Sequence, residues 1–222
     1  KFSGTGVALI TPFNNDMSID FNSLEKLVEF VINGGVDFLV VLGTTGETTS
    51  LNDKEQNDVI NCIKKTNNSR LPMILGIGGN NTSNVLEKII STDLSFFEAI
   101  LSVTPYYNKP TQEGLYQHYK AISSVSPIPI ILYNVPSRTS VNLSAETTLR
   151  LANDFSNIVA IKEASGDLDQ IKNILQNKSS NFYVLSGDDG LTYEMIKNGA
   201  SGVISVIGQS HPKEFSSMVS LS

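Results

Sequence analysis

Cysteine and histidine, the usual protein ligands of zinc, are scarce in this sequence. Among its 222 residues are one cysteine, Cys62, and two histidines, His118 and His211. One cysteine cannot form a disulfide within the chain, and a zinc module built from several cysteines is excluded. Because such a count is typical of a reducing compartment, we expect a cytoplasmic protein.

Long apolar runs and basic clusters are also missing. The longest apolar runs, 38–42 and 128–133, are far shorter than the roughly 20 residues of a membrane-spanning helix. The 16 Lys and Arg residues are scattered and outnumbered by 22 Asp and Glu, which gives a net charge of −6. We therefore expect neither a membrane anchor nor a nucleic-acid partner.

The sequence does contain a repeated alternation of short apolar runs and segments with helical spacing. Segment 24–32, for example, has an apolar helical face, follows a capping residue at Asp20 or Asn22, and stops at Gly34. Eight apolar runs recur, at 7–10, 38–42, 72–77, 99–103, 128–133, 158–161, 182–185 and 202–206. Strands that alternate with helices form right-handed βαβ units and a parallel sheet. Eight units without a break in composition favour a closed (β/α)8 TIM barrel, in one domain over 1–222, above an open doubly wound sheet.

Small, polar and aromatic residues follow most apolar runs, at the strand ends where a barrel keeps its active site. These segments are 43–47, 76–80, 104–107, 133–138, 162–165 and 186–189. A last helix is expected to begin near 210–212, yet the sequence stops at Ser222, whereas such barrels typically have about 250 residues. We expect the sequence to break off within this last barrel helix.

Lys162 is the most informative single residue. It ends an apolar strand in which Ile158, Ala160 and Lys162 alternate and are expected to share the face that points into the barrel. Burial lowers the pKa of a lysine and favours a neutral amine that can attack a carbonyl and form a Schiff base. The alternative is a strand-end lysine that extends to solvent or pairs with a carboxylate.

Tyr133 ends the preceding strand, so a phenol is expected beside the amine of Lys162. Schiff-base formation requires a proton shuttle near the nitrogen, and a hydrogen-bonded tyrosine can serve. The competing interpretation is a core tyrosine whose hydroxyl bonds the backbone.

Two further features could bind carboxylates. Thr44 and Thr45 lie between Gly43 and Gly46, in a turn where N–H groups and hydroxyls can converge on a small anion. Arg138 is suited to bidentate binding of a second carboxylate. The alternatives are a threonine that caps the next helix and an ordinary surface arginine.

Neither a phosphate cofactor nor a catalytic metal is expected. Segment 76–81 matches no phosphate-binding motif, and Asp188 and Asp189 would repel a phosphate. The acidic residues Glu47, Glu163, Asp188 and Asp189 are not accompanied by a histidine, which disfavours a metal site.

Four motifs together resemble the dihydrodipicolinate synthase and N-acetylneuraminate lyase family of class I aldolases. They are GTTGE at 43–47, TPYYNKP at 104–110, YNVPSRT at 133–139 and IKEASG at 161–166, in family order and at family-like spacing. The resemblance extends from 4–8 to 202–205 and implies a TIM-barrel lyase without a cofactor. Family members carry further helices after the barrel, and this C-terminal helical region is absent from the sequence.

The resemblance also implies a reaction. Lys162 would condense with pyruvate, and the resulting enamine would attack L-aspartate-4-semialdehyde to give 4-hydroxy-tetrahydrodipicolinate, the committed step toward diaminopimelate and lysine. Tyr133 would exchange protons through a relay with Thr44 and Tyr107. The remaining positions implied to bind substrate are Thr45, Gly187 and Ile204 for the pyruvate carboxylate and Arg138 for the aldehyde carboxylate.

Two expectations concern assembly and regulation. In the family, the tyrosine matching Tyr107 reaches into a neighbouring subunit, within a homotetramer that is a dimer of dimers. Some members bind lysine as an inhibitor near positions that match Thr48, Thr49, Gln56, Asn80, Asn84 and Tyr106. Lysine-sensitive members often carry an acid where this sequence has Asn84, so we expect weak inhibition.

Three alternatives stay open. A related pyruvate-dependent aldolase, an N-acetylneuraminate lyase or a 2-keto-3-deoxy-sugar aldolase, would use the same Schiff base with a polyol aldehyde. Arg138 favours a short acidic aldehyde instead. A non-catalytic metabolite-binding barrel and a metal-dependent class II aldolase are the other two.

Overall fold

Eight parallel strands close into a barrel in the order of the chain. The computed structural model describes residues 2–222, and β1 pairs with both β2 and β8, which closes the sheet. The strands are β1 (Gly4–Ala8), β2 (Phe38–Val41), β3 (Met73–Gly76), β4 (Ala99–Val103), β5 (Ile130–Asn134), β6 (Ile158–Glu163), β7 (Tyr183–Ser186) and β8 (Gly202–Ser205). The prediction of a (β/α)8 barrel is confirmed, and the open sheet is excluded.

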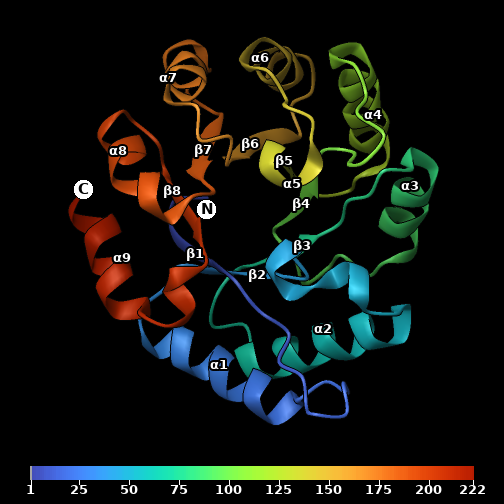
Figure 1. Cartoon of the computed structure of the whole chain (residues 1–222), viewed down its shortest axis with the longest axis vertical. Coiled ribbons are helices and arrows are strands. Elements are labelled where there is room, and N and C mark those ends of the chain that lie inside the picture. Colours follow the sequence, from blue (N-terminus) through green and yellow to red (C-terminus); the bar gives the residue numbers. More distant parts are fainter. Residues whose placement is uncertain (1) are drawn as a thin grey trace.

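Helices surround the strands as an outer ring (Figure 1). They are α1 (Phe21–Asn33), α2 (Asp53–Asn67), α3 (Thr82–Ser91), α4 (Gln112–Val125), α5 (Pro136–Thr139), α6 (Ala145–Asp154), α7 (Leu168–Asn177), α8 (Thr192–Lys197) and α9 (Pro212–Leu221). Short 3-10 turns occupy Thr44–Gly46, Thr48–Ser50, Asp189–Leu191 and Ile207–Gln209. Of the two caps considered for α1, Asp20 is the N-cap, because its side chain accepts from the Ser23 N–H. None of the helices described here is long and apolar enough to cross a membrane.

Two hydrophobic clusters lie on opposite faces of the sheet. Alternate residues of β2, β4 and β5, such as Val40, Leu101 and Ile131, fill the barrel interior. Their neighbours, such as Leu39 and Ile100, pack outward against the helices. This alternation decides which side chain at a strand end faces the barrel and which faces the helices.

The prediction that Ile158 shares the inner face with Ala160 and Lys162 is wrong. The pairing of β5 with β6 shifts register, so that Ile130 pairs with Ile158 but Ile131 pairs with Ala160. The extra residue of this bulge turns Ile158 outward, while Ala160 stays inside. The bulge lies at the start of β6 and leaves Lys162 on the inner face.

Glycine permits the closure between β1 and β8. Gly4 and Gly202 are paired and have φ values of +83° and +154°. A Cβ atom on Gly202 would lie 2.1 Å from the backbone oxygen of Gly4. A side chain at this position would force the first and last strands apart. This pairing includes Gly4 in the first strand, which therefore begins three residues before the apolar run at 7–10 that predicts it.

Candidate active site

Lys162 lies inside the barrel with only 4% of its surface exposed. The strand register places it between Tyr133 of β5 and Leu185 of β7. Its Nζ lies 4.3 Å from the centroid of the Tyr133 ring, and it forms no ion pair with any residue in 2–222. Burial lowers its pKa to about 8, and the nearby charge of Arg138 acts in the same direction, whereas Asp189 opposes both. A substantial fraction of neutral amine is therefore present just above neutral pH.

The phenol of Tyr133 is buried beside this amine and hydrogen-bonds the side chain of Thr44. Burial raises the pKa of Tyr133, while the charge of Arg138 and the bond with Thr44 oppose the rise. At neutral pH the hydroxyl is protonated and can donate. The phenol and the amine come from adjacent strands, so the β5–β6 pairing sets their separation.

The turn that carries Thr44 and Thr45 is held by threonine hydroxyls that donate to backbone carbonyls on either side of it. The Thr11 hydroxyl donates to the Gly46 carbonyl at 2.7 Å, and the Thr48 hydroxyl donates to the Leu42 carbonyl at 2.8 Å. Neither Thr44 nor Thr45 caps a helix, because the cap of α2 is Asn52. Thr44 is exposed and Thr45 half-buried. Of the two, Thr44 lines the cavity at the barrel mouth and Thr45 does not.

Arg138 lies on the short helix α5, directly after β5. Its side chain is exposed and pairs with no carboxylate in the described part of the chain. Its charge nevertheless acts on both Tyr133 and Lys162. An unpaired guanidinium close to the amine and the phenol is well placed to bind an anionic substrate.

Gly187 and Ile204 come from the last two strands. A Cβ atom on Gly187 would lie 3.0 Å from Cε of Lys162 and 2.7 Å from Cβ of Ala164. Only glycine lets the backbone after β7 pass this close to the lysine. Ile204 belongs to β8 and lies within the cluster that fills the barrel.

Tyr107 is the one predicted catalytic residue that the chain does not bring to the others. It is 84% exposed, has a backbone φ of 72° and does not line the cavity at the barrel mouth. A non-glycine residue with positive φ is uncommon, and here it turns a large aromatic side chain outward. The neighbouring Tyr106 lines that cavity.

A cavity of about 560 Å³ lies at the barrel mouth. Thr44, Tyr133 and Arg138 line it. All six positions that the family resemblance links to lysine also line it, namely Thr48, Thr49, Gln56, Asn80, Asn84 and Tyr106. Lys162, Thr45, Gly187 and Ile204 are not among its lining residues, and Lys162 is buried deeper in the barrel.

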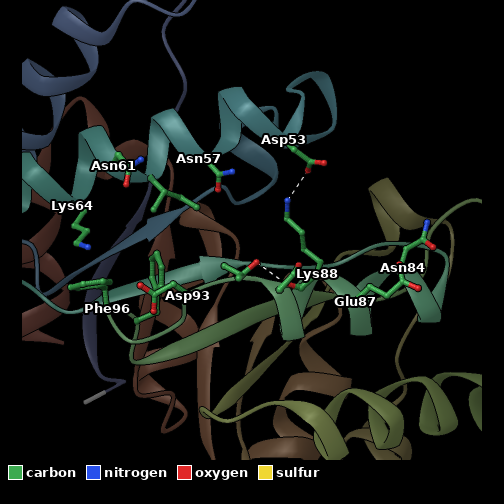
Figure 2. A pocket seen from close by; sticks show the side chains of 13 residues that line it. Asp53, Asn57, Asn61, Lys64, Asn84, Glu87, Lys88, Asp93 and Phe96 are labelled. Atoms are coloured by element: carbon green, nitrogen blue, oxygen red, sulfur yellow. Dashed lines mark hydrogen bonds and ion pairs between the residues drawn. The ribbon is translucent and has the colours of Figure 1, made fainter.

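A second cavity, of about 660 Å³, opens on the outside between α2 and α3 (Figure 2). Lys88 of α3 reaches across it to Asp53 of α2, with 2.8 Å between Nζ and Oδ1. Asp53, Asn84 and Lys88 line both cavities. The groove between the two helices therefore adjoins the cavity at the barrel mouth.

Two acidic residues have roles that residue spacing did not indicate. Glu163 is fully buried on the outer face of β6, where both of its oxygens accept from Asn134 Nδ2, at 3.2 and 3.1 Å. Burial raises its pKa, against hydrogen bonds from Asn134, Ser165 and Gln170. Asp189 accepts from two backbone N–H groups of the loop after β8. The sequence contains a signal for Glu163, because strand alternation turns the residue after Lys162 outward. It contains none for Asp189, whose contacts join two loops that only barrel closure brings together.

The acidic residues do not gather into a metal site. Asp188 caps the turn that follows β7, by accepting from the Gly190 N–H at 2.8 Å, while Glu163 lies behind the sheet. Within residues 2–222, no group of three or more His, Cys, Asp or Glu side chains could hold a metal ion.

The chain resembles known proteins over its whole length. The model of the dihydrodipicolinate synthetase family matches residues 1–222. A 4-hydroxy-tetrahydrodipicolinate synthase from Flavobacterium psychrophilum is 57% identical over 220 residues, which cover 99% of this chain and 75% of that protein. The chain thus spans about three quarters of the length of that relative.

Two solved structures have closely similar folds. The chloride-inhibited dihydrodipicolinate synthase from Acinetobacter baumannii, complexed with pyruvate, has a TM-score of 0.95 and 45% identity, and the match covers 100% of this chain and 76% of that one. The dihydrodipicolinate synthase from Thermotoga maritima has a TM-score of 0.95 and 41% identity, and the match covers 99% and 75% of the two chains.

Proposed function

The chain belongs to the dihydrodipicolinate synthetase family, and we propose that it acts as a 4-hydroxy-tetrahydrodipicolinate synthase, a lyase that joins pyruvate to L-aspartate-4-semialdehyde. The observation that carries this proposal is the buried amine of Lys162, with its lowered pKa, directly beside the Tyr133 phenol. These are the two groups that Schiff-base chemistry requires. Residues 1–222 act as one catalytic domain in this proposal.

The first half of the reaction forms the Schiff base. The neutral amine of Lys162 attacks C2 of pyruvate, and Tyr133 donates a proton to the carbonyl oxygen. The nitrogen then gives one of its protons back to the Tyr133 oxygen, and a second proton on the substrate oxygen lets it leave as water. The C–O bond breaks and an iminium cation remains, with a net uptake of one proton. Thr44 bonds the Tyr133 hydroxyl and connects it to the mouth of the barrel. There, Tyr107 from a neighbouring subunit completes the proton relay. Thr45 holds the pyruvate carboxylate, together with backbone from Gly187 and Ile204.

The second half forms the carbon–carbon bond. Loss of a proton from the methyl group turns the iminium into an enamine, whose terminal carbon attacks the aldehyde. Arg138 holds the carboxylate of the semialdehyde, because its guanidinium is unpaired and close to the reacting groups. The substrate's own amino group then attacks C2, displaces Lys162 and closes the ring.

Borohydride trapping tests this proposal. Incubation with pyruvate and borohydride reduces the iminium to a stable secondary amine, and peptide mapping by mass spectrometry locates the adduct. We expect the adduct on Lys162 alone, and none in the Lys162→Met variant. Absence of an adduct in the wild-type protein would favour the metabolite-binding barrel.

A related aldolase with a polyol aldehyde is the second candidate. It would form the same trapped adduct, so the substrate must separate the two. Arg138 supports the acidic aldehyde, and we expect turnover with L-aspartate-4-semialdehyde far above that with N-acetylneuraminate or 2-keto-3-deoxy sugars. In the Arg138→Ala variant we expect the KM for the semialdehyde to rise at least tenfold while trapping of pyruvate is retained.

We propose a homotetramer in which Tyr107 serves the site of a neighbouring subunit. Its exposure and outward turn support this assignment. A mixture of Lys162→Met and Tyr107→Phe chains tests it, since a mixed dimer would contain one site with both native residues. Recovery of activity on mixing is expected, and additive residual activities would contradict shared sites.

We propose weak feedback by lysine at the barrel mouth. Asn84 is uncharged, and the nearby Lys88 pairs with Asp53, so the cavity offers little to attract a second ammonium group. A dose series with lysine tests this, and inhibition at micromolar concentrations would overturn it. The cytoplasmic location stays a prediction from the single cysteine.

A further inference from the structure

Asp189 connects the loops that follow the last two strands of the barrel. It lies three residues beyond β7, and its Oδ2 accepts from the backbone N–H groups of Val206 and Ile207 at 3.0 and 2.8 Å. Both N–H groups belong to the loop that follows β8. One carboxylate oxygen thus holds two loops together at the barrel mouth.

The other oxygen of the same carboxylate is buried and has no hydrogen-bond partner among the described residues. A buried carboxylate oxygen without a partner is unfavourable unless a cation compensates for it. The Asp189 charge acts on Lys162 and favours the protonated form of its amine. The loop that carries Asp189 also passes close to this lysine, since a Cβ atom on Gly187 would lie 3.0 Å from Lys162 Cε.

The surroundings of Lys162 contain no second anion that acts on it. Arg138, from α5, disfavours the charge on the amine, and Tyr133, from β5, contributes a neutral phenol whose ring lies 4.3 Å from Nζ. Glu163 lies on the opposite face of the sheet and bonds Asn134. Asp189 is therefore the acidic residue in the described chain that opposes the cost of a positive charge inside the barrel.

We propose that Asp189 is the counter-ion of the Lys162 nitrogen and that it stabilises the iminium cation formed with pyruvate. It is a positioning residue, because it acts through Lys162 and through the loop it holds. This inference rests on the proposed function and deepens it. Formation of the iminium from the neutral amine takes up one proton and releases one water, so a positive charge appears on the buried nitrogen. A buried carboxylate oxygen that has no hydrogen-bond partner would stabilise that charge without reorganisation.

The Asp189→Asn substitution separates charge from shape. The amide oxygen can occupy the place of Oδ2 and accept from Val206 and Ile207, while the NH2 group replaces the unpartnered oxygen. The shape is kept and the charge is lost, while the unpartnered oxygen is replaced by a donor. Asp188→Asn is the matched control, because Asp188 belongs to the same loop and caps its turn without acting on Lys162.

The experiment measures the rate of pyruvate trapping by borohydride as a function of pH in the wild type and both variants. In the wild type we expect the rate to rise with pH through a midpoint set by the Lys162 amine. Loss of the anion favours the neutral amine, so Asp189→Asn should lower this midpoint by roughly one pH unit. It should also lower the equilibrium fraction of iminium by about tenfold, whereas Asp188→Asn should change neither quantity.

The outcomes separate this inference from the proposed function. Failure of the wild-type protein to trap pyruvate would refute the proposed function. Normal trapping in the wild type, with the same midpoint in Asp189→Asn, would refute only the counter-ion. An equal shift in both variants would also overturn it, because a change of loop structure would then explain the result. If Asp189→Asn does not fold, Asp189→Ser removes the same charge and keeps a hydroxyl acceptor for the two N–H groups.

Discussion

Replacement of Lys162 by methionine should abolish activity and at the same time stabilise the folded protein. Lys162 is 4% exposed, and burial lowers its pKa from an ordinary value of 10.5 to about 8. The folded protein therefore binds the lysine proton less tightly than the unfolded chain does. Between these two pKa values the unfolded state binds more protons, so the free energy of unfolding rises with pH.

The magnitude follows from the two pKa values. At 1.36 kcal/mol for each unit, the buried charge costs the folded protein about 3 kcal/mol at pH 7 and about 1 kcal/mol at pH 10. Methionine nearly matches the shape of the lysine stem and carries no charge, so Lys162→Met removes this cost. We expect the free energy of unfolding of the variant to exceed that of the wild type by up to about 3 kcal/mol at pH 7. At pH 10 the excess should fall to about 1 kcal/mol.

Urea unfolding followed by circular dichroism, at several pH values between 7 and 10, measures this difference. The comparison between the two proteins cancels the contributions of all other titrating groups. A difference that does not change with pH would refute the reasoning, because the lysine would then titrate alike in the folded and unfolded states. The Lys65→Met substitution provides a control that removes an exposed lysine, and its free energy of unfolding should stay within about 0.5 kcal/mol of wild type.

Three further substitutions test other parts of the site. Tyr133→Phe should lower kcat by at least about 100-fold in a steady-state assay while changing stability little, since it removes the proton donor but keeps the ring; a kcat within threefold of wild type would exclude the donor role. Glu163→Gln should lower the free energy of unfolding by about 1–3 kcal/mol, measured by urea unfolding, because an amide NH2 would face Asn134 Nδ2 in a buried site. Equal stability would show that the hydrogen bonds between Asn134 and Glu163 are dispensable. Asn84→Glu should lower the lysine concentration for half-inhibition by roughly tenfold, since it introduces an acid for the ammonium group; an unchanged dose curve would place lysine elsewhere.

Much of the fold could be predicted because barrel strands and helices have different apolar periods. The run at 99–103 coincides with β4, and Asp20 caps α1 as its side chain and position indicate. The bulge in β6 could not be predicted, because register depends on how β5 and β6 pair and a local pattern does not record it. Because of the bulge, Ile158 faces the helices, whereas the local pattern predicts that it faces the barrel interior.

For the site, the sequence by itself determined which residue types stand at the strand ends, including the lysine, the tyrosine and the arginine. A lysine at the end of an otherwise apolar strand and glycines around two threonines are local features, and local chemistry suffices to interpret them. The tertiary structure decided which of these groups meet and what their surroundings do to them. The lowered pKa of Lys162 comes from burial among eight strands, and the contact between Asp189 and the loop after β8 exists only because the barrel closes. Such effects arise between segments far apart in the chain, where solvent exclusion and charge proximity depend on the assembled barrel.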